Sequence, residues 1–144
     1  MAHIVKVVPT AWSPEQAFDY MADVSHAAEW DPGVAAASRV DSGAIGEGSA
    51  FTLDVLIGKR RVPMRYKIRD YAPGRVTFAA RTRTLESVDT VTVDHAAGRT
   101  TVTYDARFNF RGLLRVADPL LALGFRGVAD RAIRGLQRRL AEEP

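Results

Sequence analysis

The feature that most constrains this chain is one long amphipathic helix at its C-terminal end, which follows a series of strand-like segments. The predicted helix covers residues 118–140, because Asp118 is a natural N-cap and Pro119 occupies the first helical position, whose N–H has no intrahelical partner anyway. At about 100° per residue its apolar side chains form one stripe, made of Phe125, Val128, Ala129, Ala132, Ile133, Leu136 and Leu140. A single long helix must bury that stripe against a sheet. A curved sheet wrapped around one helix often leaves an apolar hollow between them, which points to a container for a small molecule.

The preceding part of the chain is dominated by alternating apolar and polar residues, the pattern of half-buried β-strands. We predict seven strands, at residues 3–8, 34–40, 49–57, 59–71, 75–83, 85–94 and 99–110. The last strand is the clearest, since its apolar side chains from Val102 to Phe110 share one face. Gly58 predicts a tight hairpin between the third and fourth strands. Because the other face of each strand is polar, we expect only one face of the sheet to be covered.

Two short helices are predicted between the first and second strands. The first, at residues 14–21, begins with Ser13 as N-cap, Pro14 at the first position and Gln16 near the third. The second, at residues 24–29, ends where proline and glycine break the chain at Trp30-Asp31-Pro32-Gly33. The element order predicts a single α+β domain over residues 1–144, with a seven-stranded antiparallel sheet wrapped around the C-terminal helix.

Composition excludes several classes of function. An apolar fraction of 47% without a run long enough to span a bilayer, and an N-terminus unlike a signal peptide, predict a cytoplasmic protein without stable membrane insertion. The absence of cysteine removes disulfides and thiolate chemistry. The net charge of +3 comes from scattered arginines without a binding motif, so we expect no nucleic-acid partner.

Common catalytic and metal-binding patterns are also missing. His3, His26 and His95 lie on separate segments without the spacing that converges ligands on one metal ion, so we predict no metal and no cofactor. No Gly-x-Ser-x-Gly elbow is present. The Gly46-Glu47-Gly48 stretch precedes a strand rather than a helix, which indicates a turn and not a phosphate loop.

The joints between the predicted elements carry a recurrent set of residues. They are Pro14, the Phe18-Asp19-Tyr20-Met21-Ala22-Asp23 run, Trp30-Asp31-Pro32, Gly46-Glu47-Gly48-Ser49, Gly98-Arg99-Thr100, Gly112 and Asp118-Pro119-Leu120-Leu121. This set resembles the helix-grip (START, birch-pollen-allergen-like, SRPBCC) superfamily and, more narrowly, its bacterial polyketide cyclase/dehydrase and lipid-transport-like group. The resemblance covers essentially the whole chain. It implies the helix-grip fold but no particular reaction, because these positions are turns, caps and packing sites.

Three polar side chains are candidates for the interior. Asp89 falls on the apolar face when residues are counted in twos from Val93 and Val91, so it is either a ligand anchor or general acid/base, or an edge position whose alternation has slipped. Because Val88 competes to define the inward face, the pattern favours the slipped edge. Tyr66 and Tyr104 present hydroxyls either to a ligand or to backbone and water in a packed core, and the second is commoner.

These observations favour binding of a hydrophobic small molecule, such as a lipid, polyketide or isoprenoid-like compound, over catalysis. The residues expected to line the cavity are Phe51, Leu53, Met64, Tyr66, Phe78, Asp89, Val91, Tyr104, Phe108, Phe125, Ala129 and Ile133. The resemblance to polyketide aromatase/cyclases implies a second candidate, a cyclase/aromatase or dehydratase that uses Asp89 with Tyr66 or Tyr104. A third candidate is an interaction module with a filled core. A cavity above about 300 Å³ favours the first two, and convergence of Asp89 with a tyrosine favours the second.

Two surfaces are possible contact sites. The outward stripe of Arg61, Arg65, Lys67 and Arg69 is either a solvated strand face or a docking face for an acidic acyl carrier protein. Before and within the start of the last helix, Leu113, Leu114, Val116, Leu120 and Leu123 add apolar area that a monomer would not leave in water. Since glycines flank this segment, the sequence favours a mobile lid over residues 113–127 rather than a homodimer or membrane contact.

Overall fold

The computed structural model describes residues 2–112 and 118–144 of the chain, although not the side chains of residues 118–123. The predicted lid residues Leu113, Leu114 and Val116 therefore lie outside the described residues, as do the side chains of Leu120 and Leu123.

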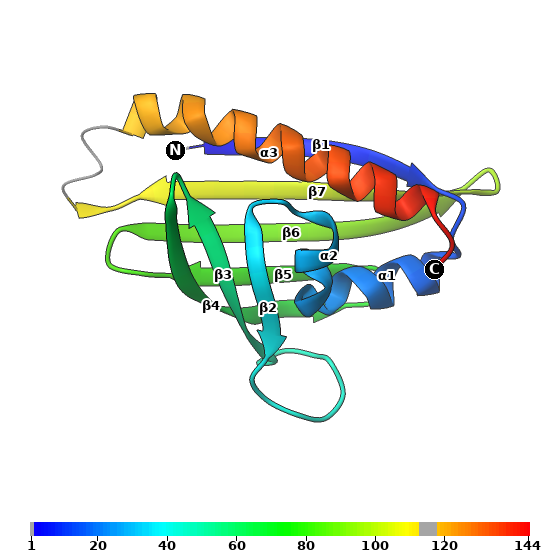
Figure 1. The fold of residues 1–144 in the computed structure, drawn as a ribbon. Helices are drawn as coiled ribbons and strands as arrows, with labels where there is room; N and C mark the ends of the chain where they lie inside the picture. The colour runs from blue at the N-terminus through cyan, green and yellow to red at the C-terminus, as the bar shows by residue number, and fades with distance from the viewer. Residues whose placement is uncertain (1, 113–117) are drawn as a thin grey trace.

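The elements follow the predicted order with small changes at their ends (Figure 1). They are β1 (Ala2–Thr10), α1 (Pro14–Ala22), η1 (Val24–His26), α2 (Ala27–Trp30), β2 (Val34–Arg39), β3 (Ala50–Ile57), β4 (Arg60–Ala72), β5 (Arg75–Arg81), β6 (Leu85–Ala96), β7 (Arg99–Phe110) and α3 (Asp118–Ala141). The second predicted short helix is divided into the 3₁₀ turn η1 and the α-turn α2. Ser13 and Gln16 form the expected capping box at the start of α1.

The seven strands form one antiparallel sheet in the order β1-β7-β6-β5-β4-β3-β2. Consecutive strands from β2 to β7 are neighbours, and β1 joins the far side by pairing with β7 along its whole length. Figure 1 shows the sheet curling, with α3 running lengthwise beside β1. This is the helix-grip arrangement of an α+β fold.

The packed core lies on the inner face of the sheet. Phe51, Met64, Phe78 and Val91 are fully buried there, and the rings of Phe51 and Phe78 meet edge to face with centroids 6.2 Å apart. Ala17, Phe18 and Met21 of α1 are buried against the same core, as the spacing of that helix predicts. The inner face at these positions is therefore filled by side chains.

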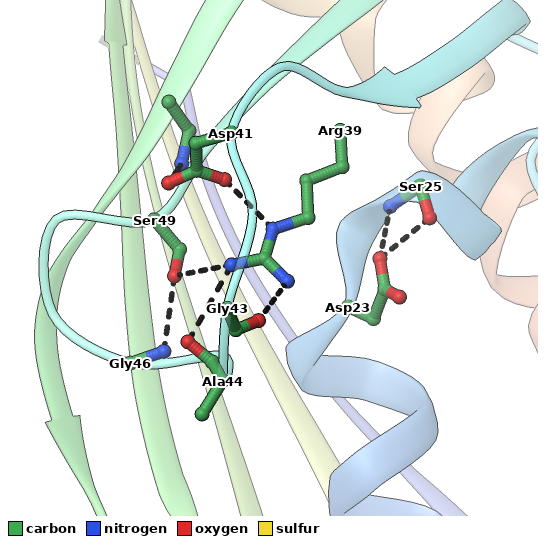
Figure 2. A network of polar contacts seen from close by, with 9 residues as sticks. Asp23, Ser25, Arg39, Asp41, Gly43, Ala44, Gly46 and Ser49 are labelled. Atoms are coloured by element: carbon green, nitrogen blue, oxygen red, sulfur yellow. Dashed lines mark hydrogen bonds and ion pairs between the residues drawn. The ribbon is translucent and has the colours of Figure 1, made fainter.

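The loop between β2 and β3, predicted as a turn, is organised by Arg39 (Figure 2). Its guanidinium donates to the Asp41 carboxylate at 2.7 Å and to the carbonyl oxygens of Gly43 and Ala44. Asp41 in turn accepts from the backbone N–H of Ala50, which joins the loop to the start of β3. Figure 2 also shows Asp23 capping η1 through Ser25.

Candidate functional site

A hollow of about 110 Å³ lies between the inner face of the sheet and α3. Its walls are mostly apolar and come from β1, the η1–α2 region and the turn after it, β2, β3, β4, β6, β7 and α3. They are formed by Ile4, Val24, Ala27, Trp30, Asp31, Gly33, Val34, Leu53, Val55, Tyr66, Ser87, Asp89, Tyr104, Ala106, Phe108, Phe125, Val128, Ala129, Ala132 and Ile133. We refer to this space as the hollow.

The hollow exists because the apolar stripe of α3 packs unevenly. Leu136 and Leu140 are buried to 0% and 1% exposure, whereas the stripe from Phe125 to Ile133 is only half-buried. At the packed end, Gly135 lies so close to the Trp30 carbonyl that a Cβ there would collide with it. The helix is thus seated firmly at its C-terminal half and spans open space in the part that precedes it.

Two pairs of aromatic side chains form part of the wall of the hollow. Phe108 of β7 and Phe125 of α3 stack with their centroids 4.5 Å apart, and Trp30 meets Tyr104 edge to face at 5.9 Å. The small side chains of Ala106, Ala129 and Ala132 also line the hollow and are too short to fill it. The residue sizes on the facing elements therefore account for the hollow.

Asp89 places a carboxyl group on the apolar wall. The Tyr104 hydroxyl donates to its Oδ2 at 3.1 Å, and the Ser87 hydroxyl donates to its Oδ1 at 3.2 Å. Burial raises the pKa of Asp89 to about 6, although both hydrogen bonds act in the opposite direction. The interpretation of Asp89 as a slipped edge position is wrong, because β6 lies between β5 and β7 and keeps its alternation from Ser87 through Asp89 to Val91.

Two tyrosines accompany this carboxyl group. Tyr66 is only 7% exposed, and burial, with the negative charge of Asp89 second, raises its pKa. The same two causes raise the pKa of Tyr104. Both phenols are therefore neutral hydroxyls at physiological pH, and each can donate one hydrogen bond and accept others.

A second carboxyl group enters from the turn after α2. Asp31 accepts a hydrogen bond from the backbone N–H of Gly33 at 2.7 Å, and burial raises its pKa. The turn brings Asp31 to the wall together with Trp30. The hollow thus combines an apolar surface with two carboxyl groups, two phenols and the Ser87 hydroxyl.

The structure brings eight of the twelve predicted cavity residues to the hollow. They are Leu53, Tyr66, Asp89, Tyr104, Phe108, Phe125, Ala129 and Ile133. The other four, Phe51, Met64, Phe78 and Val91, do not line it. They share the inner face but lie in the packed core, because alternation determines the face of a side chain and not its position along that face.

Sequence reasoning missed three polar or aromatic wall residues, Trp30, Asp31 and Ser87. Ser87 has a recognisable signal, since it lies two residues before Asp89 and so shares its face. The signal for Trp30 and Asp31 is weaker. It is only that a tryptophan and a carboxylate side chain occur in the turn that ends the second predicted short helix.

Other site types receive no support within residues 2–112 and 118–144. No group of three or more His, Cys, Asp or Glu side chains in these ranges could hold a metal ion. No helix in the described part of the chain is both long and apolar enough to cross a membrane. The outward stripe from Arg61 to Arg69 is exposed, and Arg61 pairs with Asp54 at 3.0 Å.

Comparison with known proteins supports the same fold. Residues 1–141 match the family described as polyketide cyclase / dehydrase and lipid transport. No curated protein matches the chain in sequence.

Solved structures show the likeness in three dimensions. A START superfamily protein from Mycobacterium smegmatis superposes with a TM-score of 0.78 at 14% identity, covering 97% of each chain. The Zhui aromatase/cyclase from Streptomyces sp. R1128 gives 0.74 at 14% identity, covering 96% of this chain and 90% of its own. Major latex-like protein 151 from Panax ginseng gives 0.70 at 12% identity, covering 98% of each chain. At these identities the likeness concerns the fold alone.

Proposed function

The chain belongs to the polyketide cyclase/dehydrase and lipid-transport family, and on this premise we propose that it binds a hydrophobic small molecule in the hollow between the sheet and α3. The observation that carries the proposal is a mostly apolar wall that includes a hydrogen-bonded Asp89–Tyr104 pair among its few polar groups. Such a site gains affinity from desolvating an apolar surface, and its few polar groups fix the orientation of the ligand.

The size of the hollow limits how a ligand fits. At about 110 Å³ it is an open space and not a filled core, but it does not reach the roughly 300 Å³ that would favour the two ligand-site candidates over an interaction module without a ligand. Sites for drug-sized molecules typically have roughly 300 to 1,000 Å³. A larger ligand therefore requires the half-buried stripe of α3, from Phe125 to Ile133, to move away from the sheet.

A large side chain introduced on α3 tests whether the ligand binds in the hollow. We expect Ala129→Trp to abolish uptake of Nile red, a neutral hydrophobic dye, because an indole at this position occupies the space between α3 and β7. The matched control is Gln137→Trp, which adds the same side chain to an exposed position of the same helix. Dye fluorescence measures uptake, and circular dichroism checks that both variants are folded.

The two variants separate the possible outcomes. Loss of dye binding in Ala129→Trp alone supports the hollow as the site. Undiminished uptake by a folded Ala129→Trp protein contradicts that location, and equal loss in both variants assigns the effect to the helix and not to the hollow.

A second candidate function is acid/base catalysis of the cyclase/aromatase or dehydratase type. One support is the hydrogen bond of 3.1 Å between the Tyr104 hydroxyl and the Asp89 carboxyl group. The other is the pKa of Asp89, which is raised to about 6, because a carboxyl group with such a pKa can both donate and accept a proton near neutral pH. The exposed stripe from Arg61 to Arg69 would then serve as a docking face for an acidic acyl carrier protein.

Single-turnover assays separate this candidate from simple binding. A carrier-bound polyketide that is cyclised or dehydrated by the wild type, and not by Asp89→Asn, supports catalysis. Recovery of the bound compound unchanged from both proteins supports binding alone.

A further inference from the structure

Two carboxyl groups line the hollow without a basic side chain to balance them. None of the residues that form its described walls is Lys, Arg or His. Asp31 and Asp89 also form no ion pair with a basic side chain elsewhere in the described residues. A buried carboxylate without an opposite charge is unfavourable, so the hollow lacks the one kind of group that would complement it.

The hydrogen bonds of Asp89 are compatible with its ionised form. Both of its oxygens accept, one from Tyr104 and the other from Ser87. A protonated carboxyl group keeps both contacts only if one of these hydroxyls accepts a hydrogen bond instead of donating one. The ionised form of Asp89 thus has two hydrogen-bond donors, but no basic side chain on the described walls balances its charge.

The other walls suit a cation as well. Trp30, Tyr66 and Tyr104 all face the hollow, and aromatic rings attract cations placed over their faces. The Tyr66 side chain is more than nine-tenths buried. Its hydroxyl interacts with the Ser87 side chain, and since a phenol oxygen has two lone pairs, one stays open to an N–H donor.

We propose that the hydrophobic ligand of this hollow carries a protonated amine, which lies beside the Asp89 carboxylate, with Asp31 as a second carboxylate on the wall and the rings of Trp30 and Tyr104 nearby. This inference rests on the proposed function and adds the chemical class of the ligand. A carboxylic acid of the same shape is disfavoured by repulsion from two carboxylates. An alcohol of the same shape lacks the charge that Asp89 needs.

Three probes of one chain length test this. Octylammonium, octan-1-ol and octanoate present the same apolar tail with a positive, neutral or negative head. At pH 7.5 we expect isothermal titration calorimetry to give octylammonium a Kd about tenfold lower than that of octan-1-ol, because a charge-assisted hydrogen bond is stronger than a neutral one. Octanoate should bind least.

Two conservative variants assign the preference to the carboxyl groups. Asp89→Asn keeps the shape of the side chain and should bring octylammonium and octan-1-ol to within about threefold of each other. Asp31→Asn keeps the oxygen that accepts from Gly33 and should reduce the preference less. If Asp89→Asn does not fold, Asp31→Asn still tests whether the carboxyl groups cause the preference for octylammonium.

The number of protons released on binding is a further measurement, and a ligand that only packs against the apolar wall would not release protons. The groups around Asp89 are Tyr104, Ser87, Tyr66, Asp31 and Asp105, and the wall residues of α3 carry no titratable group. At pH 6 part of the Asp89 population is protonated, so binding of octylammonium should release protons, measured by calorimetry in two buffers of different ionisation enthalpy. At pH 8 the release should vanish, and octan-1-ol should release none at either pH.

The outcomes distinguish this inference from the proposed function. Octan-1-ol binding as tightly as octylammonium, or octanoate binding more tightly than either, overturns the amine and leaves hydrophobic binding intact. Failure of all three probes to bind overturns both. A preference for octylammonium that persists unchanged in Asp89→Asn and Asp31→Asn also overturns the assignment.

Discussion

Among single residues, Asp89 is the one whose presence the fold alone does not explain. Its neighbours on the same strand face, Val91 and Val93, contribute to the core, whereas its carboxyl group is taken from water into an apolar wall. Burial raises its pKa to about 6, which means that ionising Asp89 opposes folding. A residue that lowers stability at neutral pH in a concave site is a functional candidate.

This argument predicts a particular pH dependence for Asp89→Asn. With a folded pKa of about 6 and an ordinary unfolded value, the folded wild type binds more protons between these values, so its stability falls as pH rises from about 4 to 6. The asparagine variant cannot ionise and should lack this fall. After allowing for one poorly satisfied hydrogen bond, we expect it to be more stable than the wild type by about 1–2 kcal/mol at pH 8, and no more stable at pH 4.

Urea denaturation at the two pH values measures this difference. Asp31 remains in both proteins, so the part of its raised pKa that comes from burial is common to them. A variant equally or less stable than the wild type at pH 8 would show that the folded protein stabilises the Asp89 charge in some other way.

Among the elements, α3 has two parts with different roles: its C-terminal half packs against the sheet, and the part before it covers the hollow. Its C-terminal half is held by the buried Leu136 and Leu140, and the Leu140 carbonyl accepts a hydrogen bond from Thr10 of β1 at 2.7 Å. Each buried leucine contributes roughly 2 kcal/mol. The preceding part, from Phe125 to Ile133, covers the hollow and gains less from packing.

The glycines of α3 give a matched test of this division. Gly135→Ala should destabilise the protein by at least about 2 kcal/mol, because the new Cβ meets the Trp30 carbonyl, which is backbone and cannot rotate away. Gly124→Ala meets no atom within 4 Å and should stabilise by up to about 1 kcal/mol through helix propensity. Chemical denaturation of both variants measures the contrast, and equal stability for the two would contradict the close approach of α3 to α2.

For the whole molecule, the curled sheet and the long helix α3 are tightly packed against each other at one end and enclose the hollow toward the other. The pairing of β1 with β7 brings the first strand beside α3, so both ends of the chain help to build the wall. Near the C-terminus, the Trp12 indole N–H donates to the Glu142 carbonyl at 2.7 Å and closes the packed end. Local stability should follow this division, because opening free energies depend on buried apolar contacts.

Hydrogen exchange measures that gradient directly. In the free protein, amides of residues 125–133 should exchange faster than those of residues 136–140, since the side chains of the first group are half-buried and those of Leu136 and Leu140 are fully buried. Addition of octylammonium should slow exchange in residues 125–133 and leave residues 136–140 nearly unchanged. Uniform protection along α3 that no ligand alters would contradict a ligand site beneath it.

Much of this architecture could be predicted because local rules produce it. Alternation located all seven strands, and the Ser13 capping box with Pro14 located α1. The stripe from Phe125 to Leu140 indicated which face of α3 meets the sheet. These patterns are visible in sequence because each depends only on residues a few positions apart.

The position of the hollow was decided by tertiary structure. Which inward residues fill the core, as Phe78 does, and which line open space, as Tyr104 does, depends on where α3 approaches the sheet and where it departs from it. That approach depends in turn on a contact between Gly135 and Trp30, two residues far apart in the chain. Asp31 reaches the site for the same reason, through the turn that follows Trp30. A sequence pattern records the face on which a side chain points, whereas the space in front of it is created by other elements.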